Sequence, residues 1–170
     1  MRRAILDTSV YGQISKEPDR LELIDRISSK LVTYGFKIVR DEIRDVPKKI
    51  RINNKSLRLD LLNMYDSIVK DRTIQLDSGV ISLADNYFMA YRQFGGIKTK
   101  EEIINDFLVV SAASKNGLEI VATNDEKTML NPNSLKSYTL VNPIRKFKNP
   151  SFINYKSFLK LLRGEFNEFI

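Results

Sequence analysis

The chain contains no cysteine and no histidine. The missing cysteine excludes disulfides, thiol nucleophiles and zinc sites with thiolate ligands. The missing histidine excludes Ser-His-Asp and Cys-His catalysis, histidine–metal sites and histidine acid–base pairs. Enzymatic chemistry in this chain must therefore come from carboxylates, Lys, Tyr, Ser or Thr, or from a metal ion held by oxygen. Oxygen ligands favour Mg²⁺ or Mn²⁺.

Long apolar runs are also missing. No segment approaches the roughly 20 apolar residues that span a bilayer, and the apolar run after Met1-Arg2-Arg3 is too short for a signal peptide. We therefore expect a cytoplasmic protein. The 170 residues, of which 42% are hydrophobic and 29% charged, fit a single domain over 1–170 with a packed core.

The net charge of +7 fits a polyanionic partner, and nucleic acid is the commonest of these. A lysine-rich surface that only maintains solubility would explain the same charge. The cations gather in two stretches, which favours a phosphate backbone as partner. The first stretch contains Arg40, Arg44, Lys48, Lys49, Arg51, Lys55 and Arg58, and the second contains Arg145, Lys146, Lys148, Lys156, Lys160 and Arg163. We expect RNA contacts from Arg40, Arg44, Lys48, Lys49 and Arg51.

Strand-like runs alternate with helix-like runs along the chain. Short apolar runs predict strands at 4–6, 36–39, 73–76, 118–123 and 138–141. Apolar residues at helical spacing predict helices near 21–31, from about 41, near 56–69, 82–94 and 99–115, and over about 153–169. This alternation predicts a three-layer α/β/α fold with a mostly parallel sheet of about five strands and helices on both faces.

Several helix ends have recognisable signals. Ser82-Leu83-Ala84-Asp85 and Thr99-Lys100-Glu101-Glu102 have the pattern of capping boxes, and Ser56 is expected to cap the helix that follows it. Gly95-Gly96 and Asn116-Gly117 are expected to end two helices. The amphipathic C-terminal helix either packs on the core or forms an interface.

Four acids are expected at the edge of the sheet where the parallel strands end, which is where ligands of such folds gather. Asp7 and Asp125 follow the first and fourth strands almost at once, and Glu42 lies just past the second. Asp106 lies in the N-terminal half of the helix before the fourth strand, and a crossover places that half near the same edge. Carboxylates in such a cluster repel one another, so the cluster favours one or two bound Mg²⁺ or Mn²⁺ ions. Those ions would activate water for attack on a phosphodiester, so the sequence points to a nuclease.

Each acid also has a purely structural explanation. Asp7 and Asp125 could be N-cap or turn residues. Glu42 could lie on a solvated helix end, and the neighbouring Asp41 or Asp45 could replace it as the second ligand.

Three further acids lie on helices. Asp106 stands inside a helix, where Asp is a poor former, although that helix face could simply be solvated. Glu102 could join the metal site, but it fits the capping box better. Asp85 is assigned to a cap.

These residues resemble the PIN-domain family. The run Ile5-Leu6-Asp7-Thr8-Ser9-Val10 resembles the family's opening strand and first acid, and Glu42 matches the second. The segment 105–125 resembles its later helix–strand unit, with Asp106 and Asp125 as third and fourth acids. Val141-Asn142-Pro143-Ile144 resembles the tail motif after the last strand. The resemblance runs from Arg3 to Phe147, and nothing aligns between Lys48 and Val80.

The resemblance implies a Mg²⁺- or Mn²⁺-dependent ribonuclease whose catalytic residues and metal ligands are Asp7, Glu42, Asp106 and Asp125. Thr8, Ser9, Thr123 and Asn124 would orient carboxylates or water around that site. Many small prokaryotic members resemble VapC-type toxins, which are usually dimeric and are inhibited by a partner antitoxin. The length of this chain favours such a member, with RNA as substrate, an antitoxin as partner and a homodimer as assembly.

Other readings of the same residues lead to different functions. A haloacid-dehalogenase-like phosphatase needs a second Asp where Ser9 stands, and a response-regulator receiver needs an acidic pair and a late Lys. A nuclease that matures rRNA or tRNA and a non-catalytic RNA- or protein-binding module on the same fold are alternatives. An adjacent reading frame for a small DNA-binding partner would favour the toxin.

Overall fold

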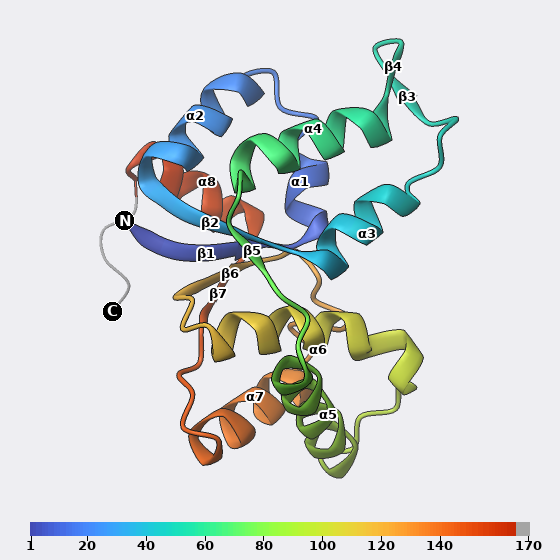
Figure 1. Ribbon diagram of the computed structural model, residues 1–170, viewed down its shortest axis with the longest axis vertical. Coiled ribbons are helices and arrows are strands. Elements are labelled where there is room, and N and C mark those ends of the chain that lie inside the picture. Colours follow the sequence, from blue (N-terminus) through green and yellow to red (C-terminus); the bar gives the residue numbers. More distant parts are fainter. Residues whose placement is uncertain (166–170) are drawn as a thin grey trace.

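The computed structural model describes residues 1–165, and a five-stranded sheet lies at its centre (Figure 1). The strand order is β5-β2-β1-β6-β7, and every neighbouring pair is parallel. The strands are β1 (Arg2–Leu6), β2 (Leu31–Phe36), β5 (Thr73–Ile74), β6 (Ile120–Ala122) and β7 (Ser151–Ile153). The predicted parallel sheet of about five strands is confirmed.

Helices cover both faces of this sheet, as predicted (Figure 1). One layer contains α1 (Thr8–Ile14), α2 (Arg20–Lys30), α3 (Lys37–Asp45), α4 (Leu57–Val69) and α8 (Tyr155–Arg163). The other contains α5 (Ser78–Gln93), α6 (Lys100–Lys115) and α7 (Pro132–Ile144). The architecture is therefore three-layer α/β/α.

The central strand β1 ends directly at the first candidate acid. Ala4, Ile5 and Leu6 are at most 1% exposed, because a strand covered by helices on both faces has no polar side. Asp7 is the next residue and the first of the turn into α1, which begins at Thr8. The sequence predicted only a turn there, and the helix is an addition.

The predicted ends of α6 are correct. Thr99 and Glu102 form the reciprocal capping box, in which the Glu102 carboxylate accepts from the Thr99 backbone N–H at 2.7 Å. Asn116 follows the last turn, and Gly117 takes the left-handed conformation with φ +64°. Because Glu102 is used in this cap, the capping interpretation of that residue holds.

The predicted strand at 138–141 is wrong, because these residues lie in α7. The run Tyr138-Thr139-Leu140-Val141 consists of strand-forming residues. However, Ser134, Ser137, Tyr138 and Val141 are buried at helical spacing, whereas Thr139 and Leu140 are exposed. Asn131 caps the helix and Pro132 opens it. The tail-motif residues Val141-Asn142-Pro143-Ile144 are the end of this helix, and the fifth strand is β7 instead.

Two other boundaries also differ from the prediction. The second strand is Leu31–Phe36 rather than 36–39, since Lys37 already begins α3. The capping box at Ser82–Asp85 is not one, because α5 begins earlier and the Asp77 carboxylate caps it by accepting from the Val80 N–H at 2.8 Å. Asp85 lies inside α5 and pairs with Lys100 at 2.8 Å, so its assignment to a cap is wrong.

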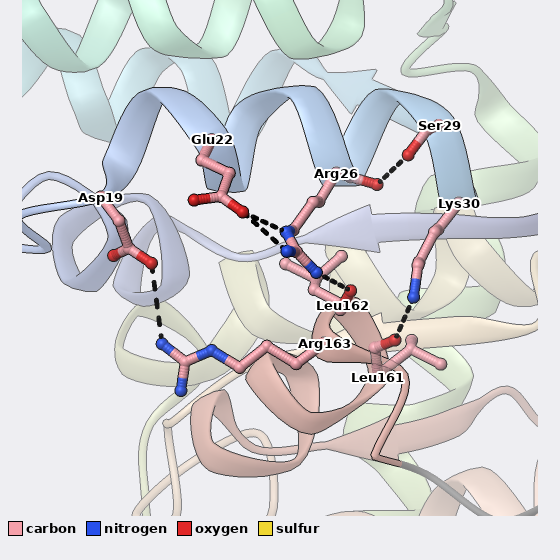
Figure 2. A network of polar contacts seen from close by, with 8 residues as sticks. All are labelled: Asp19, Glu22, Arg26, Ser29, Lys30, Leu161, Leu162 and Arg163. Carbon is pink, nitrogen blue, oxygen red and sulfur yellow. Dashed lines mark hydrogen bonds and ion pairs between the residues drawn. The ribbon is translucent and has the colours of Figure 1, made fainter.

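The C-terminal helix α8 packs against α2 (Figure 2). Phe158 and Leu162 are fully buried. Around them, Arg26 and Lys30 of α2 donate to the carbonyl oxygens of Leu162 and Leu161, at 3.4 and 3.5 Å. These donors meet the C-terminal end of α8, whose last carbonyl groups have no partner within the helix. The structure gives the helix as 155–163, and positions 166–169 of the predicted 153–169 helix lie outside the described residues.

A small hairpin stands apart from the main sheet. Its strands β3 (Arg51–Ile52) and β4 (Lys55–Ser56) pair with each other antiparallel and with no other strand of the described chain. The hairpin connects α3 to α4, within the stretch from Lys48 to Val80 where nothing aligns with the PIN-domain family.

No helix among residues 1–165 is both long enough and apolar enough to cross a membrane.

A buried tyrosine holds the junction between β2 and α3. The Tyr65 hydroxyl accepts from the Phe36 N–H at 2.9 Å and donates to the Phe36 carbonyl at 3.3 Å. Gly35 permits this approach, because a Cβ at that position would lie 2.4 Å from the Tyr65 oxygen. The junction matters because α3 carries Glu42.

We expect Tyr65→Phe to lower the free energy of unfolding by about 1–3 kcal/mol, since it leaves the buried Phe36 N–H unpaired. Tyr34→Phe is the matched control, because its ring lies against Arg3 and its hydroxyl makes no hydrogen bond to another described residue. Urea unfolding of both variants measures the difference. Equal stability of the two would contradict a structural role for the Tyr65 hydroxyl.

Candidate active site

Four elements bring the candidate acids to one edge of the sheet. Asp7 follows β1, Glu42 lies on α3, Asp106 lies on α6, and Asp125 lies in the loop after β6. The edge is the carboxyl end of the parallel strands, because Asp7 and Asp125 both come after strands that pair in parallel. Asp7 is 6% exposed, and the other three acids are partly buried.

Asp7 is held by two hydroxyl groups. Ser9 Oγ donates to Asp7 Oδ2 at 2.7 Å, and Thr123 Oγ1 donates to the same oxygen at 3.0 Å. Asp7 occupies the N-cap position of α1, but its side chain makes no capping hydrogen bond with the backbone N–H groups of the helix. Asp7 is therefore an N-cap residue by position, but capping does not explain why a carboxylate stands there.

The same hydroxyl groups connect Asp7 to the loop that carries Asp125. The Asn124 N–H donates to Ser9 Oγ at 3.1 Å, and the Asp125 N–H donates to Thr123 Oγ1 at 3.0 Å. The Ser9–Asn124 and Asp7–Thr123 bonds join segments 115 and 116 residues apart, so they fix the Asp125 loop relative to Asp7.

Glu42 is tied to both neighbouring helices. Thr8 Oγ1 of α1 donates to Glu42 Oε2 at 2.6 Å, and Asn105 Nδ2 of α6 lies 3.5 Å from Glu42 Oε1. Asp41, the alternative second acid, is instead engaged by Lys37 and Arg44 on its own helix. Among these neighbours, Glu42 is the acid that shares the edge with Asp7.

Asp125 is held by the turn that follows it. Its Oδ1 accepts from the N–H groups of Lys127 and Thr128 at 3.0 and 2.9 Å, and its Oδ2 accepts from the Thr128 hydroxyl. The capping explanation for Asp125 is therefore correct as far as the turn is concerned. The turn also fixes the carboxylate at the edge, so the two roles coexist.

The charges of the four acids act on one another. The pKa of Asp106 is raised to about 7, chiefly by burial and further by the charges of Asp125, Asp7 and Glu42, while a hydrogen bond with Thr128 acts to lower it. Burial also raises the pKa of Glu42, with Asp7 and Asp125 adding to the effect.

Asp125 responds in the opposite direction. Burial acts to raise its pKa, but the hydrogen bonds from Thr128, Lys127 and Asp106 outweigh burial and lower it. Near neutral pH, Asp125 is therefore ionised, and Asp106 holds a proton in a large share of molecules.

The donor set fits a hard divalent cation in its chemistry. All four groups are carboxylates, and oxygen ligands of this kind suit Mg²⁺ and Mn²⁺. Burial, and to a smaller extent the neighbouring acids, raise the pKa of Glu42 and Asp106, and a cation between the carboxylates would favour their ionised forms. Hydroxyl or N–H donors hold the carboxylates of Asp7, Glu42 and Asp125. No three acids within residues 1–165 have the spacing of a ready-made metal site.

Of the four polar residues predicted to orient the carboxylates, three contact the acids with their side chains and Asn124 does not. Thr8, Ser9 and Thr123 donate directly to Glu42 or Asp7. The Asn124 side chain points elsewhere, since its Oδ1 accepts from the Tyr155 N–H at 2.8 Å and so joins the loop to the start of α8.

Two residues at the edge were missed from the sequence. Thr128 contacts Asp125 with both its N–H and its hydroxyl, and Asn105 lies against Glu42. The spacing of Asp125 and Thr128 is the pattern of an Asp-initiated turn, which could have indicated Thr128. Asn105 has no sequence signal apart from its position next to Asp106.

The predicted RNA-binding cations lie beyond the acids along α3 and the hairpin. Arg40 and Arg44 are on α3, Arg51 is on β3, and Lys48 and Lys49 lie between them. The second basic stretch does not form one surface, because Arg145 to Lys148 follow α7 while Lys156, Lys160 and Arg163 are on α8.

Comparisons with known proteins bear on the fold of the chain. No protein-family model matches the sequence, and no curated protein matches it. Among solved structures, the chain is similar to a chain of VapBC2 from Rickettsia felis bound to a DNA fragment from their promoter. The TM-score is 0.54 and the identity 14%, over 89% of this chain and 98% of that one. The chain has the PIN-domain fold.

Two further structures share the PIN fold with this chain. A chain of FitAB bound to an IR36 DNA fragment matches with a TM-score of 0.57 and 15% identity, over 89% of this chain and 94% of that one. A chain of VapBC-5 from Mycobacterium tuberculosis, a member of the VapBC family of toxin-antitoxin systems, matches with a TM-score of 0.55 and 16% identity, over 91% and 99%. The recognition of a PIN-like, VapC-like fold from the sequence is confirmed.

The stability of the cation-free protein should depend on pH through Asp106. The folded pKa of Asp106, about 7, exceeds the ordinary 3.8. Its contribution to the free energy of unfolding is therefore fully present below about pH 4 and is lost as the pH rises through 7. Asp106→Asn cannot ionise and should avoid that loss. In EDTA we expect the variant to melt about 5 °C above the native chain at pH 8, with the difference shrinking towards pH 5.

Asp85→Asn is the control for that measurement, because the Asp85 carboxylate lies on α5 and pairs with Lys100. It should show no such pH-dependent gain in melting temperature. A constant difference between Asp106→Asn and the native chain from pH 5 to pH 8 would contradict the charge repulsion at the edge.

Proposed function

We propose that this chain is a metal-dependent endoribonuclease that hydrolyses RNA phosphodiester bonds. The observation that carries the proposal is that four elements bring Asp7, Glu42, Asp106 and Asp125 to one edge, where their charges act on one another. The Thr123 hydroxyl also links Asp7 to the Asp125 backbone. The PIN fold supports the proposal, since the same edge of that fold would carry the acids. The absence of histidine and cysteine from the sequence leaves carboxylates as the chain's means of binding a metal ion.

The four carboxylates would hold one or two Mg²⁺ or Mn²⁺ ions. Such ions supply a nucleophilic water at neutral pH and stabilise the charge that develops on the phosphate. The hydroxyl groups of Ser9, Thr123 and Thr8 keep Asp7 and Glu42 turned towards the edge. Thr128 does the same for Asp125. The protein's part in this scheme is therefore to fix the direction of these three carboxylates before substrate arrives.

We expect the native chain to cut a fluorescently labelled RNA pool with Mg²⁺ or Mn²⁺ and to be inactive in EDTA. Asp7→Asn should reduce the rate about 100-fold or more, because it removes one charge from the cation site and retains an oxygen that Ser9 and Thr123 can reach. The readout is fragment formation on a gel.

Asp85→Asn is again the matched control and should cut like the native chain. Both variants should keep the native melting temperature in EDTA to within a few degrees, so loss of activity is not loss of fold. Cleavage that survives in Asp7→Asn, or that continues in EDTA, would overturn the proposal.

Within this activity, we propose the role of toxin in a toxin–antitoxin pair, acting as a homodimer. The support is that the similar structures are VapBC and FitAB complexes, one of them described as a member of a toxin-antitoxin family. An rRNA- or tRNA-maturation nuclease is the alternative within the same chemistry.

Expression in a bacterial host separates these two roles. A toxin should arrest growth within a few generations, whereas Asp7→Asn should not, because arrest requires cleavage. Co-expression of a neighbouring small open reading frame should restore growth. Normal growth with active, soluble native chain would instead favour maturation.

A further inference from the structure

The first basic stretch divides into two groups when its ion pairs are considered. On α3, Arg40 pairs with Asp66 at 3.2 Å and Arg44 lies 3.5 Å from Asp41. Their charges are therefore partly neutralised within the protein. The cations of the segment 46–56, which we call the hairpin arm, are not neutralised in this way.

The hairpin arm carries four exposed cations, which are Lys48, Lys49, Arg51 and Lys55. None of them forms an ion pair with another residue of the described chain. Arg51 Nη1 donates to the Asn54 carbonyl at 3.2 Å, which fixes the side chain without cancelling its charge. The arm contains no acidic residue, so all of its charged side chains are positive.

The arm also has a defined backbone conformation. Its tip residues Asn53 and Asn54 take left-handed φ angles of 50° and 62°, as in the tight turns that suit hairpins. The Leu57 N–H donates to the Ile50 carbonyl at 3.0 Å, which closes the base against the start of α4. A two-stranded hairpin alone is marginally stable in water, so this attachment is what holds the cations in place.

The position of the arm relates it to the acids. It continues directly from α3, and Glu42 lies three residues before the end of that helix. Figure 1 shows the arm extending from the α3 side of the molecule, at the opposite end from α7. A strand of nucleic acid whose scissile bond lies at the acids could therefore run along α3 onto the arm.

The composition of the arm determines what it can recognise. It contains no aromatic residue, so it offers no platform on which unpaired bases could stack. Exposed Lys and Arg side chains bind phosphate oxygens, and these contacts carry no sequence information. The partner chemistry that fits is therefore an RNA sugar-phosphate backbone, without regard to base sequence.

We infer that the hairpin arm holds the RNA substrate by its phosphate backbone, and that Arg40 and Arg44 contribute less. This inference rests on the proposed ribonuclease function for its choice of RNA as partner. It goes beyond that function because it assigns binding to a segment that contains none of the four acids.

The test measures RNA binding in a cleavage-inactive background. Each variant carries Asp7→Asn, and affinity for a labelled 20-nucleotide RNA is measured by fluorescence anisotropy over a series of salt concentrations. The arm variant replaces Lys48, Lys49, Arg51 and Lys55 with Gln. The control variant replaces Lys136, Arg145, Lys146 and Lys148, which are exposed on α7 and just after it. Both variants lose the same net charge.

Loss of four phosphate contacts should flatten the slope of log affinity against log salt by about 3. The control variant should keep a slope close to that of the parent. A second RNA of the same length and different sequence should give the same loss in the arm variant. Both variants should melt within a few degrees of the parent, because the replaced side chains are exposed.

Equal slopes for the arm and control variants would overturn the inference, since binding would then follow net charge alone. A parent that binds a DNA duplex and not RNA would overturn it as well. Because no step of this test requires cleavage, a chain that never cuts RNA but shows the arm-specific slope would refute the proposed activity and leave the arm as the binding element.

Discussion

The repulsion between four carboxylates at one edge of the sheet is the constraint on which the site depends. Placing Asp7, Glu42, Asp106 and Asp125 together at a partly buried edge is unfavourable for their charged forms, and burial together with the neighbouring charges raises the pKa of Glu42 and Asp106. The protein meets this cost with hydroxyl donors. Ser9 and Thr123 hold Asp7, Thr8 holds Glu42 and Thr128 holds Asp125, so three of the four acids have a fixed direction.

The fold provides the positions that this arrangement requires. A buried central strand ends at Asp7, and its parallel neighbour β6 ends just before Thr123, so two acids and their shared donors meet at one edge. The crossover helix α6 returns antiparallel to β6 and brings Asp106 to the same place. Glu42 depends on the β2–α3 junction, which Tyr65 and Gly35 fix. The strand order of the PIN fold thus brings acids that are distant in the sequence to one edge of the sheet.

Much of this was accessible from the sequence because the rules involved are local. The apolar run before Asp7, the capping box at Thr99 and the Asn116-Gly117 ending each depend on neighbouring residues, and all agree with the structure. The strand predicted at 138–141 failed because strand-forming residues there are buried at helical spacing. Asn105 and the pairing of Arg40 with Asp66 could not be predicted, since both join segments distant in the chain.

The central claim is that these acids form one cation site, and thermal unfolding at pH 8 with increasing Mn²⁺ tests it most directly. A ligand that binds only the folded state raises the melting temperature as its concentration rises above the dissociation constant. The account predicts such a rise for the native chain and its near-complete loss in Asp7→Asn combined with Glu42→Gln, while Asp85→Asn behaves as native. An equal rise in all three proteins, or none in the native chain, would contradict a metal site at this edge.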